Sequence, residues 1–226
     1  MNNQADTIDL NRDKTLTSSL NRTMYFFIKR LFDILMAIIG IIAMIPIALI
    51  VKISYMLTGD FDSIFYKQKR IGKNGKIIYI YKFRSMIPNA DEVLKELLKN
   101  PKYKKEWQKN QKLENDPRIT KAGKILRKTS LDEMPQFIAV FKGDMSLIGP
   151  RPLIEGELDA HNGNHQIYEA VKPGITGWWA SHGRSDTTYE ERLELEYFYV
   201  NNCSLKIDIK CIAATVKAVI CKKGAK

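Results

Sequence analysis

An uncharged apolar run over residues 34–51, ILMAIIGIIAMIPIALIV, most constrains what this chain can fold into. Its 18 residues would form about 27 Å of α-helix, near the lower limit for crossing a bilayer. Lys29 and Arg30 precede the run, and Lys52 follows it. Because positively charged flanks favour the cytoplasm, both ends of the segment are expected on the same side of a membrane.

Pro46 lies inside the apolar run, where a proline removes one backbone hydrogen bond and kinks a helix. A bent helix that enters and leaves by the same membrane face accounts for the length, the proline and the charged flanks together. A helix buried in a protein core and a straight membrane span are the alternatives. We expect the re-entrant helical hairpin and assign residues 25–57 to it.

The stretches on either side differ from this segment in composition. Residues 1–24 are polar and lack periodicity, so we interpret them as a flexible tail. They do not have the basic start and early apolar core of a secretory signal. Residues 58–226 suffice for one well-buried core, and we expect a single compact domain there.

The charge balance indicates an anionic partner. The chain has 36 Lys and Arg against 25 Asp and Glu, a net charge of +11, and nucleic acid, an acidic membrane and a phosphorylated substrate would all suit it. Residues 65–84 contain seven basic side chains and no acidic one, around a Gly72–Gly75 turn that predicts a β-hairpin. Anionic headgroups and a phosphorylated substrate are both candidate partners for this hairpin.

Three further segments have the periodicity of helices. Asn89 begins a capped amphipathic helix, and a lysine-rich helix follows around 101–113. Residues 206–219 place apolar side chains on one face and lysines on another, as in helices that lie on a membrane surface or pack against a core. The expected fold class is a helix-rich α/β arrangement, in which a re-entrant hairpin joins a compact interfacial domain with a small β-hairpin.

The cysteines and histidines do not predict a metal site. Cys203, Cys211 and Cys221 match no metal-ligand spacing, and we expect free thiols in a reducing cytoplasm. His161 and His165 are four residues apart, but the glycine between them weakens the helix that this spacing requires. We therefore predict no zinc site.

Two adjacent carboxylates, Asp132 and Glu133, lie in SLDEMPQ at the start of a helix that is predicted to end at Gly143. A structural role would explain them, since Ser130 and Glu133 have the spacing of a capping box and the helix dipole stabilises carboxylates there. Arg127 precedes the pair, however, and GPRP later holds Arg151 between two prolines that restrict its backbone.

These neighbours favour a catalytic role for the carboxylates. A carboxylate close to guanidinium groups and a helix N-terminus is expected to stay ionised, and an ionised Asp132 could attack phosphorus. The same cations would neutralise the phosphate that is attacked. An adjacent glutamate suits Mg²⁺, which needs one or two carboxylates plus phosphate oxygens and water.

Three segments together resemble one protein family: KFRSM at 82–86, RKTSLDEMPQFIAVFKGDMSLIGPRPL at 127–153, and KPGITGW at 172–178. They are similar to those of the bacterial polyprenyl-phosphate sugar-1-phosphate transferases in their small, monotopic form. The resemblance extends from about Lys29 to the C-terminal helix. It implies transfer of sugar 1-phosphate from a UDP-sugar to membrane polyprenyl phosphate with release of UMP, which begins capsule, exopolysaccharide or glycoprotein glycan assembly.

The resemblance also implies residue roles, Mg²⁺ as cofactor, and a catalytic domain on the cytoplasmic face of the bacterial inner membrane. Asp132 would be the nucleophile of a two-step mechanism, and Glu133 would help to hold the metal. The other implied residues are Lys82, Arg84, Arg127 and Arg151 facing phosphate, Arg184 in a nucleotide-sugar loop, and Lys29, Arg30, Asp33 and Pro46 in the membrane anchor. Other glycan-assembly enzymes are implied as partners, and nucleic acid is not.

The chain departs from the family pattern at two places. Ile45 precedes the kink proline where many members have Ser, and residues 178–182 read WWASH where many have Trp-x-Gln-Val. The sugar therefore stays open, and we interpret His182 as a packing residue. The alternative functions are a non-catalytic membrane-associated module that binds anionic lipid or nucleic acid, and a scaffold for glycan-assembly enzymes. Both leave the intact Asp-Glu pair unexplained.

Overall fold

The computed structural model describes residues 3–110, 113–183 and 187–220. Its helices are α1 (Asn3–Met56), α2 (Ala90–Leu97), α3 (Pro101–Asn110), α4 (Lys121–Thr129), α5 (Phe137–Lys142), α6 (His165–Tyr168), α7 (Trp178–His182), α8 (Tyr189–Asn202) and α9 (Leu205–Ile220). Its strands are β1 (Phe65–Ile71), β2 (Ile77–Phe83), β3 (Ser146–Ile148) and β4 (Gly174–Thr176), and short 3₁₀ helices are η1 (Lys73–Gly75), η2 (Leu131–Gln136) and η3 (Asp159–His161). The fold is helix-rich, as the sequence predicts, and has two small sheets, of which the sequence analysis expected only the β1–β2 hairpin.

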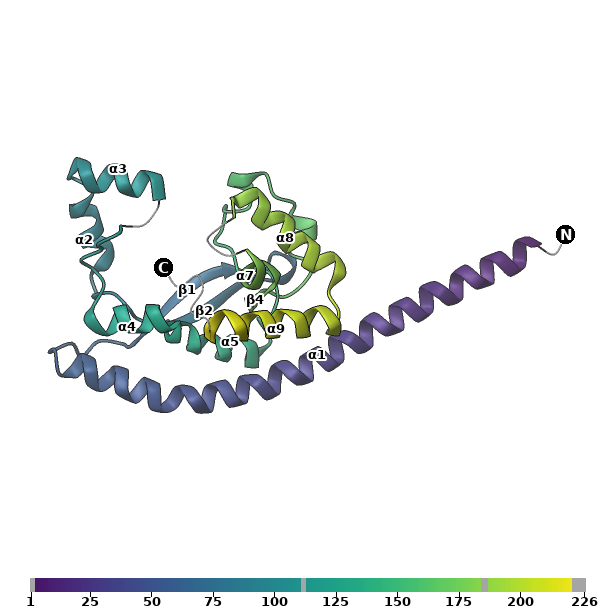
Figure 1. Cartoon of the computed structure of the whole chain (residues 1–226), viewed down its shortest axis with the longest axis horizontal. Coiled ribbons are helices and arrows are strands. Elements are labelled where there is room, and N and C mark those ends of the chain that lie inside the picture. Colours follow the sequence, from purple (N-terminus) through teal and green to yellow (C-terminus); the bar gives the residue numbers. More distant parts are fainter. Residues whose placement is uncertain (1–2, 111–112, 184–186, 221–226) are drawn as a thin grey trace.

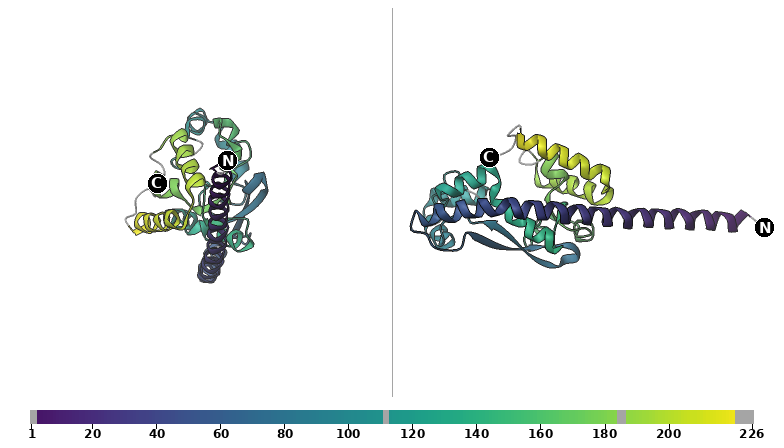
Figure 2. Two further views of the ribbon diagram at one scale, coloured as in Figure 1. Left: turned by 90° about the vertical axis from the view of Figure 1, so that its right-hand side faces the viewer. Right: turned by 90° about the horizontal axis from the view of Figure 1, so that it is seen from below.

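Helix α1 is continuous and bows along one side of the molecule (Figures 1 and 2). The predicted re-entrant hairpin is not confirmed, since the structure has one continuous helix there, and entry and exit by the same membrane face stay a prediction. Pro46 lies within the helix, and the bend is spread over a gentle curve because the domain packs along the concave side. Residues 3–24 are helical rather than irregular, since each residue added to a nucleated helix gains a backbone hydrogen bond. The mobility of this stretch stays a prediction.

Charged residues fasten α1 to the domain. Arg30 donates to the carbonyl oxygens of the last turn of α5 at 2.7 and 2.8 Å. Asp33 is buried and accepts from the Ser146 hydroxyl at 3.1 Å and the Leu147 N–H at 2.8 Å. These contacts hold α1 against the start of β3. The predicted anchor residues thus connect the apolar helix to the domain.

Asp208 of α9 is a second attachment point. Its carboxylate accepts from the hydroxyls of Tyr25 and Tyr199 at 3.0 and 2.7 Å and pairs with Lys29 at 2.8 Å. All of these side chains are buried or nearly so. Because buried charges need hydrogen-bonded partners, this cluster joins α1, α8 and α9 in one arrangement.

Strands β1 and β2 form the predicted antiparallel hairpin, with Phe65 opposite Phe83 and Ile71 opposite Ile77. Strand alternation divides its basic side chains between the two faces. Arg70 and Lys82 share the inner face with buried isoleucines, whereas Lys69 points outward and pairs with a glutamate at 2.7 Å. The hairpin is therefore not a uniformly basic surface.

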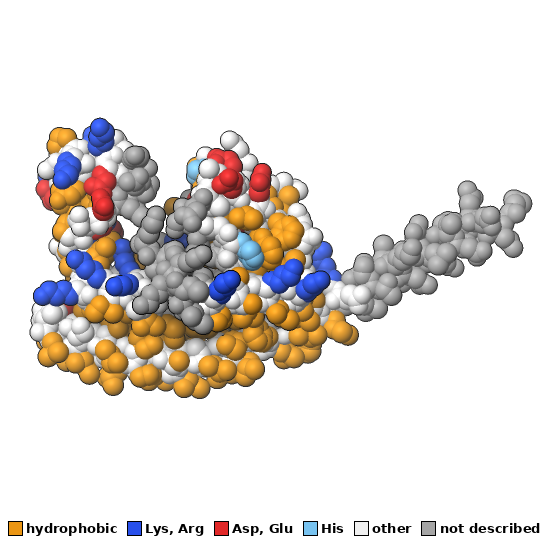
Figure 3. Space-filling view, in the orientation of Figure 1, with side chains coloured by type: hydrophobic (Ala, Val, Ile, Leu, Met, Phe, Trp, Pro, Cys, Tyr) orange, Lys and Arg blue, Asp and Glu red, His pale blue; other side chains and the backbone are white. Residues whose placement is uncertain are grey.

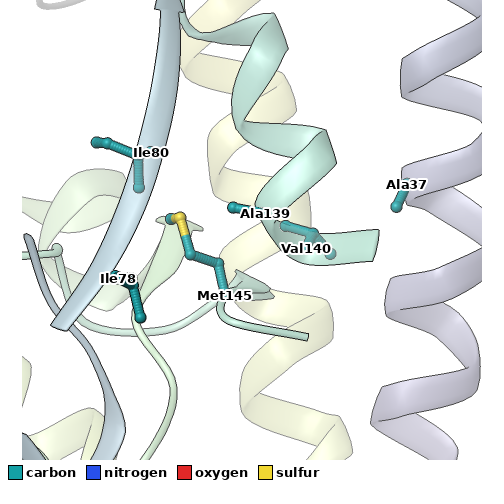
Figure 4. Close-up of a cluster of buried hydrophobic side chains, with 6 residues drawn as sticks. All are labelled: Ala37, Ile78, Ile80, Ala139, Val140 and Met145. Carbon is teal, nitrogen blue, oxygen red and sulfur yellow. The ribbon is translucent and has the colours of Figure 1, made fainter. Parts of the chain in front are cut away.

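The main core lies between α1, β2 and α5, as Figure 4 shows. The cluster consists of Ala37, Ile78, Ile80, Ala139, Val140 and Met145, with α5 between Ala37 on one side and the two isoleucines of β2 on the other. Gly40 permits the close approach of α1, because a Cβ atom there would lie 2.5 Å from the Phe137 ring. The helix that follows the two carboxylates is thus held between the hairpin and α1.

Strands β3 and β4 pair in parallel, with Ser146 opposite Gly174 and Ile148 opposite Thr176. This pairing brings the GPRP turn beside the segment KPGITGW. Gly149 is required by the close approach, since a Cβ atom there would lie 2.4 Å from the Lys172 carbonyl oxygen.

The remaining predicted helices are present. Asn89 takes the N-cap position of α2, but its side chain makes no capping bond to any described residue. Helix α9 packs Cys211 into the core, so its packing role is confirmed; it also exposes Ile209 and Val216, and contact with a membrane surface stays a prediction. Cys203 and Cys211 are free thiols, as expected, and Cys221 lies outside the described residues.

Candidate active site

A pocket lies where the hairpin, η2, the GPRP turn, β4, α7 and α8 meet. Its polar lining residues are Arg70, Lys82, Glu133, Gln136, Arg151 and Glu196, and its volume is about 50 Å³. A larger cavity of about 250 Å³ lies beyond the GPRP turn, beside α6 and η3, and contains none of the predicted site residues. We assign the candidate active site to the smaller pocket because Glu133 of the carboxylate segment and two of the predicted cations, Lys82 and Arg151, line it together.

The carboxylate pair lies in the first turn of η2, at the start of the helical segment that ends at Gly143 as predicted. The capping box, which was the structural alternative to a catalytic role for this pair, does not form between Ser130 and Glu133. Ser130 has a left-handed backbone with φ of 56°, and its side chain makes no capping bond within the described residues. Glu133 instead pairs with the Lys82 ammonium group at 2.7 Å. Its side chain is therefore turned toward the pocket and away from the helix end.

Burial raises the pKa of Asp132 above its ordinary value. The positive charges of Lys82 and Arg127 lower it, and the neighbouring Glu133 raises it further. The net shift is upward because loss of water outweighs the attraction of the cations, whereas the sequence analysis considered only those cations and the helix N-terminus, which favour the ionised form. A carboxylate that has already lost part of its water has less solvation to lose before it attacks.

The structure brings three of the four predicted phosphate-facing residues to this region. Lys82 and Arg151 line the pocket, and Arg151 is exposed at its rim. Arg127 is exposed at the end of α4, where its Nε donates to the Ser85 hydroxyl at 2.8 Å. It is near enough to affect the pKa of Asp132.

Arg84 has a different environment from the other three. Its guanidinium is nearly buried and forms a two-pronged pair with Asp60 at 2.8 and 2.9 Å. It also donates to the carbonyl oxygens of Ser63 and Met86. Because these bonds occupy its donors, Arg84 fastens the loop after α1 to the hairpin, and it does not line the pocket. Arg184 lies outside the described residues.

Two residues of the pocket were missed in the sequence. Arg70 lies on the inner face of the hairpin, and Glu196 of α8 accepts from the Arg151 backbone N–H at 3.0 Å. Burial raises the pKa of Glu196 to about 7. One signal was available in the sequence: Glu196 lies on the apolar face of its helix, three residues after Leu193 and three before Tyr199.

The donor set suits magnesium only if substrate completes it. Among the described residues, no group of three or more His, Cys, Asp or Glu side chains could hold a metal ion. Mg²⁺ is commonly held by one or two carboxylates with substrate phosphate and water, and the Asp132–Glu133 pair meets that requirement. His182 stacks on Trp178 with ring centroids 3.9 Å apart, in keeping with a packing role.

An apolar surface lies beneath the pocket. Figure 3 shows a continuous apolar underside with a row of Lys and Arg side chains just above it. Helix α1 supplies much of this underside, and Asn21–Met56 is long and apolar enough to cross a membrane by length and composition. Its exposed apolar side chains recur every three or four residues; they include Met24, Phe27, Leu31, Leu35, Ile38, Ile42, Ile45, Leu49, Ile53 and Met56.

Comparison with known proteins identifies similar chains. Residues 24–222 match the family described as bacterial sugar transferase. The chain is 46% identical over 200 residues to the undecaprenyl-phosphate galactose phosphotransferase of Salmonella typhimurium, which covers 88% of this chain and 42% of that protein. It is 42% identical over 198 residues to the exopolysaccharide production protein ExoY of Sinorhizobium fredii, covering 87% of each.

A third similar protein is the UDP-N-acetylgalactosamine-undecaprenyl-phosphate N-acetylgalactosaminephosphotransferase of Aeromonas hydrophila. It is 33% identical over 225 residues, covering 97% of this chain and 50% of that protein. The chain therefore spans about half or less of the Salmonella and Aeromonas proteins and most of ExoY.

Proposed function

Because the chain belongs to the bacterial sugar transferase family, we propose that it transfers sugar 1-phosphate from a UDP-sugar to membrane polyprenyl phosphate and releases UMP. The observation that carries this proposal is the meeting of Glu133, Lys82 and Arg151 in one pocket, directly beside Asp132. The Salmonella and Aeromonas relatives act, by their names, on undecaprenyl phosphate and on galactose or N-acetylgalactosamine, and ExoY is named for exopolysaccharide production. Membrane glycan assembly, as for exopolysaccharide or capsule, is the proposed setting.

The first proposed step forms a covalent intermediate. A carboxylate oxygen of Asp132 attacks the sugar-bearing phosphorus of the donor, and the bond from that phosphorus to the bridging oxygen breaks. The electron pair of the broken bond leaves with UMP. Lys82 and Arg151 line the same pocket and would neutralise charge on the diphosphate as it rearranges.

The second proposed step returns the enzyme to its starting state. A phosphate oxygen of the lipid attacks the phosphorus of the aspartyl phosphosugar, and the bond from phosphorus to Asp132 breaks. The product is a polyprenyl diphosphate sugar, and Asp132 is again a carboxylate. The lipid phosphate is already ionised at neutral pH, so this attack needs no general base, in keeping with the packing role of His182.

Magnesium is the proposed cofactor. Glu133, with Asp132 beside it, would hold the ion together with substrate phosphate oxygens, and the ion would withdraw charge from the diphosphate. Glu133 would have to exchange its Lys82 partner for the ion, and the displaced ammonium group would then be available to substrate phosphate.

The proposed location is the cytoplasmic face of the inner membrane. The domain covers one side of α1 from Tyr25 to Tyr55, and the other side exposes the apolar row. A helix with a domain along its length cannot stand alone across a bilayer. We propose that α1 lies in one leaflet and that both ends of its apolar row face the cytoplasm, which is the re-entrant placement expected from the sequence.

UMP release by the purified protein in detergent tests this function. The donor panel contains UDP-galactose, UDP-glucose and their N-acetylated forms, each with and without polyprenyl phosphate and Mg²⁺. Release should depend on Mg²⁺, rise with the lipid and favour one donor. Asp132→Asn should abolish turnover because the amide is a poor nucleophile, whereas the matched exchange Asp62→Asn in the loop after α1 should retain it. No release from any donor by the wild-type protein would exclude the proposed function.

A further inference from the structure

Arg70 is a buried guanidinium without a carboxylate partner. Its side chain is 8% exposed and lines the pocket. One of its nitrogens donates to the Gln68 side-chain oxygen at 2.6 Å, and its Nε has no hydrogen-bond partner among the described residues. A guanidinium removed from water at this depth is costly unless an anion offsets its charge.

Other buried arginines of the chain show what a purely structural role looks like. Arg84 pairs with Asp60 through two bonds, and Arg118 pairs with Asp116 at 2.7 and 2.9 Å. Both have a carboxylate partner supplied by the fold. Arg70 differs because, within the described ranges, the fold supplies it with a neutral amide in place of a carboxylate.

The surroundings of Arg70 add positive charge. Burial and the nearby charge of Arg151 lower the pKa of Arg70, Glu157 raises it, and Arg192 lowers it again. Arg192 is also buried, pairs with Glu157 at 3.4 Å, and has two nitrogens without partners among the residues that the structure describes.

The described carboxylates around Arg70, Arg151 and Arg192 are few, and most of their oxygens already have hydrogen-bond partners. Glu157 pairs with Arg192, and one oxygen of Glu196 is used by the Arg151 backbone N–H. The other oxygen of Glu196 has no partner in the described part of the chain. Among the described residues, this corner thus contains three guanidinium groups, those of Arg70, Arg151 and Arg192, and two carboxylates, those of Glu157 and Glu196. It has a surplus positive charge at the wall of a pocket.

We propose that Arg70 is a further substrate-binding residue, whose guanidinium binds the donor diphosphate together with Arg151. The hairpin register supports this placement. Lys82 lies opposite Tyr66 and Arg70 lies opposite Ile78, so the two cations share one face, four residues apart along the strand. That spacing is roughly 13 Å between backbones. Two long side chains can converge on a diphosphate from such positions.

Lys82 and Arg70 would therefore bind different phosphates of the donor. Lys82, bonded to Glu133, lies beside the carboxylate pair, where the sugar-bearing phosphate must be attacked. Arg70 lies farther from that pair and would bind the phosphate that leaves with the nucleoside. This assignment rests on the proposed function, because it takes the diphosphate of the nucleotide-sugar as the ligand.

The test compares Arg70→Gln with Lys69→Gln, its neighbour on the outer face. Binding of UDP is measured by calorimetry, and KM is measured separately for the UDP-sugar and for polyprenyl phosphate. Arg70→Gln should weaken UDP binding and raise the donor KM at least tenfold, with the lipid KM unchanged. Lys69→Gln should stay within twofold of the wild type in UDP affinity, in donor KM and in lipid KM. Arg70→Lys keeps the positive charge but not the planar guanidinium, and its affinity for UDP should fall about fivefold.

Thermal unfolding separates binding from a structural role. Without ligand, Arg70→Gln should unfold at the wild-type temperature or above, because an unpaired buried charge is removed, and the rise in Tm that UDP gives the wild type should be lost. If Arg70→Gln does not fold, Arg70→Lys provides the same comparison.

Three results would overturn the inference while leaving the proposed function intact. They are UDP affinity within twofold of the wild type in a variant with a lowered Tm, an increase in the lipid KM alone, and equal losses in Lys69→Gln. A wild-type protein that turns over no donor would instead refute the proposed function itself.

Discussion

Single residues around the pocket link catalysis to the rest of the domain. Glu196 does so by one hydrogen bond, since its carboxylate holds the backbone of Arg151 and thereby the GPRP turn. Its side chain is 1% exposed, and burial raises its pKa to about 7. The position of Arg151 thus depends on a buried carboxyl group that changes charge near neutral pH.

Glu196→Gln should therefore change how stability depends on pH. The carboxyl ionises near 4.5 ordinarily and near 7 when folded, so between these values the folded state holds the proton more tightly. Wild-type stability should fall as pH rises through this window and stay lower above it, a loss on the order of 3 kcal/mol that Gln does not share. Urea unfolding of both proteins in detergent at pH 5 and pH 8 measures this. An equal change in the free energy of unfolding of the two proteins between pH 5 and pH 8 would contradict this prediction.

Residues whose chemistry is local were predictable from the sequence. Asp132 and Glu133 are adjacent, and GPRP marks Arg151 with two prolines, so their shared site could be expected. Arg84 was assigned to phosphate from its motif, but its partner Asp60 is 24 residues earlier in the chain. Arg70 was overlooked because the sequence does not show that this arginine is buried without a carboxylate partner; only the folded structure does.

Among the elements, α1 determines how the molecule meets a membrane. Its apolar row from Met24 to Met56 is about 48 Å long at 1.5 Å per residue, whereas a bilayer core is about 30 Å thick. The row cannot fit within the core in a perpendicular helix. Exposed lysines lie on α4, α5 and α9, at Lys124, Lys128, Lys142, Lys206, Lys210 and Lys217.

Both ends of α1 should consequently be accessible from the cytoplasm. Asn21→Cys and Thr58→Cys in a cysteine-free background provide one probe at each end. A membrane-impermeant maleimide should label both in inside-out vesicles and neither in right-side-out vesicles, because basic flanks stay on the cytoplasmic side. Labelling of the two positions from opposite sides would contradict this placement and support a helix that crosses the membrane.

The elements that sequence reasoning found are those with local signals. The β1–β2 hairpin has a Gly-rich turn, and α5 ends at Gly143 as expected. The parallel pair β3–β4 was missed because each strand has three residues and its partner is about 28 residues away. A sharp bend at Pro46 is not confirmed, because a proline in a helix that packs along its length can be accommodated by gentle curvature.

At the scale of the whole molecule, the apolar underside and the polar pocket belong to one structure. The underside with its basic row suits an anionic membrane surface (Figure 3). The pocket is formed above it by the hairpin, η2 and the GPRP turn. A water-soluble nucleotide-sugar and a lipid phosphate would meet at such a place, because one comes from solution and the other from the leaflet.

The covalent intermediate on Asp132 tests the central claim most directly. The purified protein is incubated with its preferred UDP-sugar and Mg²⁺ but without polyprenyl phosphate, quenched in acid, and measured by intact-protein mass spectrometry. We predict a gain of one sugar phosphate that maps to Asp132, disappears when polyprenyl phosphate is added, and does not form in Asp132→Asn. An unchanged mass in a protein that still releases UMP on lipid addition, or an adduct at another residue, would contradict it.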